Sequence, residues 1–478
     1  MKILNNKFII SKHLGNFSGL VLNQFASFLT PIIILLYVGR YYPHNDFGIY
    51  SVAVSFANIF AVFFSFGLGN IIIYEIAYLN IYNKERIPYF IGDAIVSFFI
   101  LSLFCFSMIP IALNFFNYDI YLMKIILILL IGNWFLCFSN LFISIFIGQK
   151  KMFMPVLFSG TTLLGVIGFV FPALFLKKDI LTIVLLLTVS RTLGMVVIIF
   201  AVLKMKLVHF SFKVKFNSIR YIIKRSLGVG LDNVIYMMGV NITNILLPIF
   251  IPLSAVGIFN GVFRPFTVLT LPHQILFTFS SPYFSEKKDV KYEREMRLQI
   301  FHEVVSLINI FIMTFVFFFP EKLTVLFFGE KFISVPSYYM KFLSLGYLIY
   351  YFPPYSAIIK AFGFEWQVLS CSFIQLLVNI VCLVILVPRY GLKGAVLSII
   401  IAYLSYWLAE VYIYWRNKIQ PVRRWDNILK YLFITLLTGY LLETYITEYA
   451  MYIFAVVCGS IIFLFMPKEI LKYKLVLK

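Results

Sequence analysis

Long apolar stretches recur along almost the whole chain, with short polar segments between them. About fourteen of these stretches approach the roughly 20 apolar residues that a helix needs to cross a bilayer. We place them at 16–38, 47–74, 90–115, 120–147, 155–176, 180–202, 226–251, 254–280, 298–320, 338–361, 366–388, 392–415, 429–445 and 449–466. The pattern predicts an all-α polytopic membrane protein with about fourteen transmembrane helices.

The polar segments differ in charge from one side of the predicted membrane to the other. Lysine and arginine concentrate in alternate connections, on the side of the N-terminus, and the basic segment 204–225 is the longest of these. Cytoplasmic loops carry such an excess of Lys and Arg. The distribution therefore predicts that both termini lie in the cytoplasm.

Composition supports a membrane protein and changes how the net charge is read. Hydrophobic residues make up 62% of the 478 residues and charged residues only 13%, against about 25% charged in soluble domains. The formal net charge of +20 would suggest nucleic-acid binding in a soluble protein. Here we expect the basic loops to contact anionic membrane lipids instead, and we expect no nucleic-acid partner.

Short landmarks recur in the two halves of the chain in the same order. Phe47-Gly48-Ile49 opens the second stretch, and Val256-Gly257-Ile258 opens the eighth. Internal repeats of this kind are common in transporters. We therefore expect two like-oriented six-helix lobes around a central cavity, residues 1–215 and 216–418. A C-terminal helix pair with a basic cytoplasmic tail, residues 419–478, follows them.

Polar side chains lie in rows on some of the apolar stretches. One face of the eighth stretch carries Asn260, Arg264, Thr267, Gln274 and Thr278. The displacement that relates the two landmarks carries Ser51, Ser55, Asn58, Ser65 and Gly69 onto these same positions. The first stretch has a shorter row that includes Asn23. Such rows either line a polar cavity or join helices through hydrogen bonds.

Two arginines fall deep inside predicted helices, Arg191 in the sixth stretch and Arg264 in the eighth. A charged side chain at this depth is costly unless it meets water, an acid or an anionic ligand. The planar guanidinium matches the geometry of phosphate oxygens. Both arginines are therefore candidates for binding an anionic substrate. An ion pair with Asp232 or Glu303 is the alternative.

Three more charged residues are candidates. Lys124 and Lys341 lie near the outer ends of their stretches, where they either extend to the membrane surface or meet a ligand at the outer mouth. Asp232 lies deeper, and we expect it either to couple transport to a proton or cation or to form a salt bridge with a neighbouring helix.

Motifs for covalent chemistry are missing. The sequence has no P-loop, no HExxH and no GxSxG, and its five cysteines fall singly within apolar stretches. We expect no cofactor, no metal site and no enzymatic activity, with the cysteines serving as packing residues.

Several motifs, in order and over nearly the whole chain, resemble those of a known family. They are Asn23-Gln24, Asp46-Phe-Gly-Ile-Tyr50, Val256-Gly-Ile-Phe-Asn-Gly-Val-Phe-Arg264, Ser281-Pro-Tyr-Phe-Ser285 and Pro388-Arg-Tyr-Gly-Leu-Lys-Gly-Ala395. The chain resembles the polysaccharide transporters, and specifically the O-antigen repeat-unit flippases, of the multidrug/oligosaccharidyl-lipid/polysaccharide (MOP) exporter superfamily. Phe259 stands where that family often has tyrosine.

The resemblance implies a function. It implies that an undecaprenyl-pyrophosphate-linked oligosaccharide moves from the inner to the outer leaflet of the bacterial inner membrane by alternating access, with Arg264 facing the pyrophosphate. It also implies a polymerase and a chain-length regulator as pathway partners. Two alternatives remain: a drug or metabolite exporter of the same superfamily, and an O-antigen polymerase or ligase.

Overall fold

The computed structural model is helical throughout the part of the chain that it describes. It describes residues 30–465 apart from 117, 150, 152, 205–215, 271, 273–290, 334, 352–364, 418–424 and 446–448. Within these residues nine helices are long and apolar enough to cross a membrane, and no strand occurs. The predicted all-α membrane fold is confirmed. The number fourteen stays a prediction, since parts of stretches 16–38, 254–280 and 338–361 lie outside the described residues.

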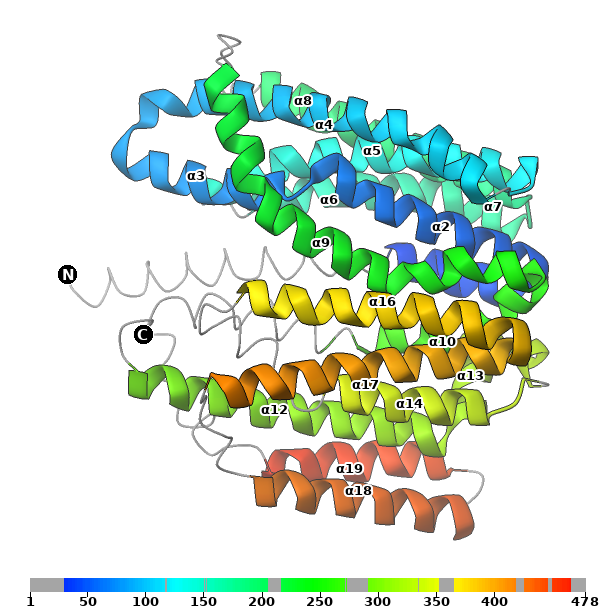
Figure 1. Ribbon diagram of the computed structural model, residues 1–478. Coiled ribbons are helices and arrows are strands. Elements are labelled where there is room, and N and C mark those ends of the chain that lie inside the picture. The colour runs from blue at the N-terminus through cyan, green and yellow to red at the C-terminus, as the bar shows by residue number, and fades with distance from the viewer. Residues whose placement is uncertain are drawn as a thin grey trace. The chain divides into compact units, whose positions relative to one another are not determined.

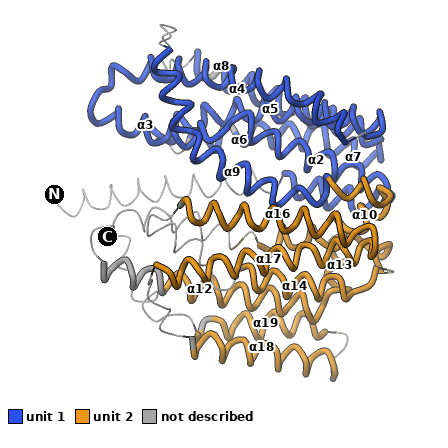
Figure 2. Tube along the Cα trace, viewed as in Figure 1, with its two compact units in different colours: residues 1–245 blue, residues 246–478 orange. Residues whose placement is uncertain are grey.

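The helices form two compact units, residues 1–245 and 246–478 (Figure 2). The unit boundary falls inside one helix, α9 (Phe216–Phe250), and therefore after the predicted boundary at 215/216. The predicted C-terminal part, 419–478, belongs to the second compact unit. The assignment of two six-helix repeats stays a prediction.

Unit 1 is a bundle of long helices (Figure 1). Its described elements after the helix at Thr30–Tyr41 are α2 (His44–Ser65), α3 (Leu68–Tyr82), η1 (Lys84–Arg86), α4 (Ile87–Phe116), α5 (Ile120–Gly148), α6 (Phe153–Gly165), the π-helical segment η2 (Val166–Val170), α7 (Phe171–Phe175), α8 (Ile180–Lys204) and most of α9. Helix α5 packs against α2, α3 and α8, which makes it central to the unit.

A break separates α2 from α3 within the predicted stretch 47–74. Phe66 and Gly67 both adopt left-handed backbone angles, with φ of 35° and 76°. Glycine accepts this conformation without strain, whereas a side chain opposes it. The break therefore depends on Gly67 and on the contacts that hold Phe66 in place.

Small residues bring α8 close to its neighbours. A Cβ on Gly132 of α5 would lie 2.7 Å from the Thr188 hydroxyl of α8, and one on Gly165 of α6 would lie 3.0 Å from the Ser190 side chain. Helix pairs in membranes use small residues for such close packing. These contacts fix the register of α8 against α5 and α6, and with it the position of Arg191.

An aromatic cluster forms around the only tryptophan of residues 1–245, Trp134 of α5. The Trp134 indole donates a 2.9 Å hydrogen bond to the Ser102 hydroxyl of α4. Its ring lies 6.0 Å from both Phe98 and Phe138, nearly parallel to the latter. The indole N–H thus has a partner, as buried tryptophans usually do.

Unit 2 contains the second set of helices. They are α10 (Leu253–Leu269), α12 (Lys291–Phe318), α13 (Pro320–Phe328), η3 (Glu330–Phe332), α14 (Tyr338–Tyr351), α16 (Glu365–Tyr390), α17 (Leu392–Arg416), α18 (Trp425–Tyr445) and α19 (Ala450–Phe465). Helices α16 and α17 form a tight hairpin, and α17 packs against α14.

The C-terminal helices α18 and α19 pack on α12. Phe311, Phe315 and Phe318 of α12 contact Phe454 of α19. The Phe318 ring fills the space beside Gly439 of α18, where a Cβ would lie 2.2 Å from it. This aromatic packing joins α18 and α19 to the rest of unit 2.

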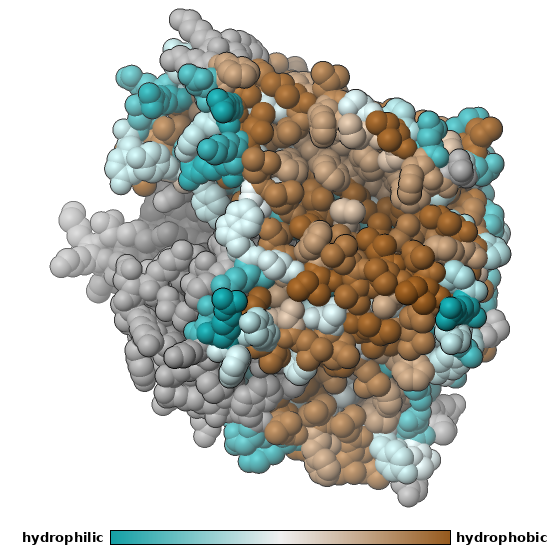
Figure 3. Space-filling view, viewed as in Figure 1, coloured by the Kyte–Doolittle hydropathy of each residue, from teal (hydrophilic) through white to brown (hydrophobic). Residues whose placement is uncertain are grey.

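The surface of the helices is apolar, as a membrane requires. Figure 3 shows a broad hydrophobic surface over the helices, with hydrophilic side chains gathered near helix ends. Many large apolar side chains on it are exposed, among them Leu103, Phe200 and Val381. In a bilayer these side chains contact acyl chains.

Candidate functional site

Arg191 lies near the middle of α8, roughly 17–20 Å from each end at 1.5 Å per residue. Its Nη1 donates a 2.5 Å hydrogen bond to Oδ1 of Asn133 on α5. Asn133 is 4% exposed, and its own Nδ2 donates a 2.9 Å hydrogen bond to the carbonyl of Ala57 on α2. Three helices of unit 1 thus meet through one amide and one guanidinium.

The surroundings of Arg191 are neutral. Tyr50 of α2 and Cys137 of α5 lie close enough to interact with it electrostatically, and the Cys137 thiol donates to the Ala61 carbonyl at 3.3 Å. In the described part of the chain, no carboxylate lies within ion-pair distance of Arg191. The ion pair that was the alternative is therefore not seen for Arg191 among these residues, whereas for Arg264 it stays a prediction. A cation in this position can accept an anionic ligand.

Arg264 forms a similar arrangement in unit 2. It lies on α10, is 7% exposed, and donates from Nε to Oδ1 of Asn260 at 3.0 Å. Asn260 in turn donates from Nδ2 to the Val256 carbonyl at 2.9 Å. In each unit, therefore, an asparagine accepts from an arginine within an apolar helix while it donates to a backbone carbonyl.

Other members of the predicted row on α10 have internal partners. The Thr267 hydroxyl donates a 2.7 Å hydrogen bond to the Arg264 carbonyl, one turn back in its helix. Asn260 is fully buried. Both residues thus satisfy contacts within α10, and a role in ligand contact stays a prediction. Gln274 and Asn23 lie outside the described residues.

Close packing fixes α10 on the side of Gly261. A Cβ on Gly261 would lie 2.1 Å from the ring of Phe332 in η3, which is almost fully buried. One turn further on, the Phe266 ring stacks on Tyr347 of α14 with centroids 4.7 Å apart. The helix that carries Arg264 therefore packs against two elements of unit 2, η3 and α14.

The remaining predicted residues lie apart from these two arginines. Asn58 is half-buried on α2, beside the Ala57 carbonyl that binds Asn133. Lys124 is exposed near the start of α5. Asp232 is half-buried on α9 and has interactions of its own.

Lys341 has a partner that the sequence did not reveal. Its Nζ lies 3.4 Å from Oε1 of Glu443 on α18 and 5.7 Å from the centroid of the Phe317 ring. A pocket of about 230 Å³ in unit 2 is lined by Lys341 and Glu443 together with Glu321 and Lys322. The pocket carries both charge signs.

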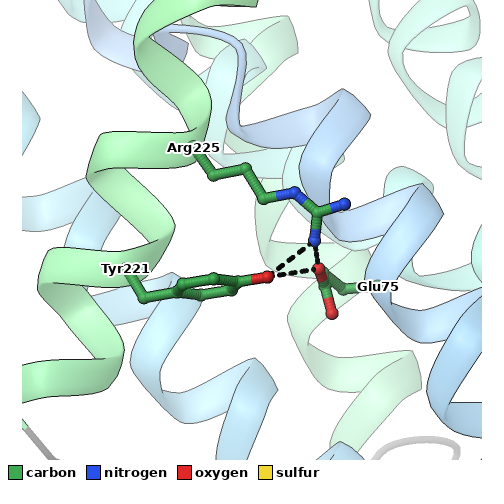
Figure 4. A network of polar contacts seen from close by, with 3 residues as sticks. All are labelled: Glu75, Tyr221 and Arg225. Carbon is green, nitrogen blue, oxygen red and sulfur yellow. Dashed lines mark hydrogen bonds and ion pairs between the residues drawn. The ribbon is translucent and has the colours of Figure 1, made fainter.

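A polar network joins α3 and α9 at the ends predicted to be cytoplasmic (Figure 4). Arg225 of α9 forms an ion pair with Glu75 of α3, and Tyr221 donates a 3.2 Å hydrogen bond to the same carboxylate. Arg225 also donates to the Tyr221 hydroxyl at 2.9 Å. Nothing in the sequence pointed to these residues, because none of them lies deep in an apolar stretch.

Asn133 and Asn244 were also not predicted from the sequence, although an asparagine inside an apolar stretch is a signal. Asn244 of α9 is buried and donates from Nδ2 to the Ser55 hydroxyl of α2 at 3.1 Å. Like Asn133, it is an amide within an apolar stretch, and a buried amide needs hydrogen-bond partners. Among the described residues, no group of His, Cys, Asp and Glu could hold a metal ion.

Comparisons with known proteins identify the family of the chain. The family model described as "Polysaccharide biosynthesis protein" matches residues 14–288, more than half of the chain. No curated protein is significantly similar in sequence.

Among solved structures, one of the lipid II flippase MurJ in an inward closed conformation is 18% identical, with a TM-score of 0.71. The match covers 95% of this chain and 100% of that one. An inward-facing multidrug resistance MATE family transporter of the MOP superfamily is 15% identical, covering 81% of this chain and 94% of that one, with a TM-score of 0.63. A MOP superfamily transporter from Pyrococcus furiosus is 15% identical, covering 85% and 94%, with a TM-score of 0.51. These matches show that the chain has the fold of MOP transporters.

Proposed function

Because the chain belongs to the polysaccharide biosynthesis protein family, we propose that it is a flippase for lipid-linked oligosaccharides. It moves an undecaprenyl-pyrophosphate-linked O-antigen or polysaccharide repeat unit from the inner to the outer leaflet of the bacterial inner membrane by alternating access. Both termini lie in the cytoplasm. The substrate class follows from the family, and the similarity to the MurJ fold supports it.

The observation that carries the proposal is the mid-helix Arg191 with a neutral partner. A sugar and a pyrophosphate cannot cross hydrocarbon unaided, whereas a prenyl tail can stay in the lipid. A guanidinium with free N–H groups offers the pyrophosphate charge-assisted hydrogen bonds that replace its water. Arg264, held by Asn260, offers a second cation in the other unit.

The proposed transport needs no covalent chemistry by the protein. In this proposal the sugars contact the polar side chains of Asn58, Asn23, Gln274, Asn260 and Thr267. The substrate meets Lys124 and Lys341 at the outer end of the passage. Asp232 couples transport to a proton or cation. A pathway polymerase and chain-length regulator act on the product after it reaches the outer leaflet.

A drug or metabolite exporter shares the fold, but Arg191 argues against one for cationic drugs. A cationic drug favours acids in its site and is repelled by an uncompensated guanidinium. Export of cationic dyes by cells that express the protein, at a rate above that of empty-vector cells, would favour this second function.

Cells whose own flippase gene is deleted provide the test. We expect the protein to restore surface polysaccharide, and Arg191→Ala or Arg264→Ala to leave lipid-linked units in the inner leaflet, inaccessible to a glycosidase added to spheroplasts. Arg86→Ala, a change of the same type in the exposed turn η1, serves as the control. If the variants instead accumulate unpolymerised units that the glycosidase reaches, the flippase assignment fails and a polymerase is favoured.

A further inference from the structure

Asn133 is the one described side chain that binds Arg191 directly, and its amide is oriented by a second contact. Nδ2 donates to the Ala57 carbonyl at 2.9 Å, which leaves Oδ1 as the atom that faces Nη1 of Arg191. The opposite amide orientation would place two donor groups against each other. The backbone of α2 therefore determines which atom of Asn133 the arginine meets.

The register of the helices keeps this contact in place. Gly132, next to Asn133, lies against Thr188, one turn before Arg191 on α8. The Thr188 hydroxyl also donates to the Ile128 carbonyl of α5 at 3.0 Å. Because α8 packs closely on α5 at this level, a shift of Arg191 along α5 would break the contact of Gly132 with Thr188 and the Thr188 hydrogen bond.

The neutrality of Asn133 is the decisive chemical property. A carboxylate here would pair with Arg191 and neutralise it, whereas an amide oxygen binds one N–H and leaves the positive charge. A guanidinium has five N–H donors, and Asn133 accepts from one of them. The remaining donors are sufficient for a bidentate contact with phosphate oxygens.

We propose that Asn133 is a positioning residue that holds Arg191 in a fixed orientation with its charge uncompensated, so that the guanidinium binds the pyrophosphate of the lipid-linked substrate. This inference rests on the proposed function. It adds the residue that sets the charge of the site, and it predicts that the site selects anions because its partner residue is an amide.

Replacement by aspartate separates this role from a structural one. Asn133→Asp keeps the size of the side chain and places a carboxylate beside Arg191. A purely structural contact would exchange the Nδ2 bond to the Ala57 carbonyl for an ion pair with Arg191, and any loss would appear in the melting temperature. An anion site would lose its free charge and therefore its affinity for the anion. Asn140→Asp, on the same helix and exposed, adds the same charge roughly 10 Å further along α5 and is the matched control.

The experiment measures binding of farnesyl pyrophosphate, with farnesol as the uncharged comparison, to the purified full-length protein in detergent. We expect Asn133→Asp and Arg191→Gln each to weaken binding by about tenfold or more, the loss of a charge-assisted contact. We expect the double variant to lose no more than Arg191→Gln alone, and Asn140→Asp to bind as the wild type does. Melting temperatures are recorded for all variants.

Three outcomes would overturn the inference. Asn133→Asp could bind as tightly as the wild type while Arg191→Gln does not, which would leave the proposed function intact. The affinity and the melting temperature of Asn133→Asp could fall together, with the same two losses in Asn133→Ala. That result would assign Asn133 a structural role. Farnesol could bind as well as farnesyl pyrophosphate to the wild type, which would overturn the proposed pyrophosphate recognition as well.

Discussion

Gly67 and Gly230 lie backbone to backbone in unit 1. A Cβ on Gly67 would come within 2.8 Å of the Gly230 nitrogen, and a Cβ on Gly230 would come within 2.8 Å of the Phe66 carbonyl oxygen. Helix α9 therefore packs directly on the break between α2 and α3, where both the backbone and the ring of Phe66 lie against Gly230. The ion pair of Glu75 and Arg225 joins the same two segments further along.

Gly230→Ala tests this contact. The added methyl group has no space, and overpacking of this kind costs about 1–3 kcal/mol. We expect a lower melting temperature of the purified protein by differential scanning fluorimetry. Gly160→Ala in α6, where a Cβ would meet nothing within 4 Å, should leave the melting temperature unchanged or raise it. Equal effects at the two positions would contradict the packing.

The Glu75–Arg225 ion pair should contribute little by comparison. The Arg225 side chain is 46% exposed, and exposed pairs contribute about 0–1 kcal/mol. A double-mutant cycle with Glu75→Gln and Arg225→Gln should give a coupling energy within this range, and the coupling should shrink at high salt. A coupling of several kcal/mol would show that the pair is shielded from water.

Gly261→Ala should disturb α10. Its methyl group would overlap the Phe332 ring, so we expect a loss of about 1–3 kcal/mol, seen as a lower melting temperature. Gly261→Ala combined with Phe332→Leu should recover part of the loss, because the smaller side chain leaves room. If the single variant is as stable as the wild type, Phe332 does not occupy the space beside Gly261.

Lys331 should be unusually reactive. Burial lowers the pKa of Lys331 from 10.5 to about 8, so about half of its amine is neutral at pH 8. We expect a membrane-impermeant amine reagent added outside intact spheroplasts to label it with a midpoint near pH 8, measured by peptide mass spectrometry. Lys331→Arg removes the labelled peptide. Labelling only after the membrane is opened would contradict the proposed topology.

The same pKa predicts how stability depends on pH. Between pH 8 and 10.5 the unfolded chain holds a proton on Lys331 that the folded protein has released, so stability rises with pH over this interval. Lys331→Met should remove this part of the rise. The comparison of melting temperatures at pH 8 and pH 10 for both proteins checks it.

Asp232→Asn tests ion coupling. If Asp232 binds the coupling ion, the variant should lose the dependence of transport on pH or sodium that the wild type shows in proteoliposomes. Asp426→Asn, a change of the same kind at an exposed position, should keep it. An unchanged dependence in Asp232→Asn would exclude this residue from coupling.

The class of fold followed from the sequence because apolar length alone reports a bilayer-spanning helix. The break at Phe66 and Gly67 did not, since a glycine inside an apolar stretch has no local mark that separates a straight helix from a broken one. Its conformation depends on Gly230, which is far away in the chain.

The two arginines could be identified because a charge inside an apolar helix is rare. Their partners were harder to predict. Asn260 lies one turn before Arg264, a spacing that predicts side-chain contact, although its place in the polar row indicated a substrate contact instead. Asn133 and Arg191 are brought together only by helix packing, and the same holds for Lys341 and Glu443.

Trp134 follows Asn133 directly on α5 and is the only indole of residues 1–245, the other four tryptophans being Trp366, Trp407, Trp415 and Trp425. Replacing these four with phenylalanine would leave a protein whose tryptophan emission, excited selectively over that of its tyrosines, comes from one residue adjacent in sequence to the proposed anion site. Its intensity and wavelength maximum would then record ligand arrival in real time without a chemical dye, a signal that the placement of aromatic residues has already built into the chain.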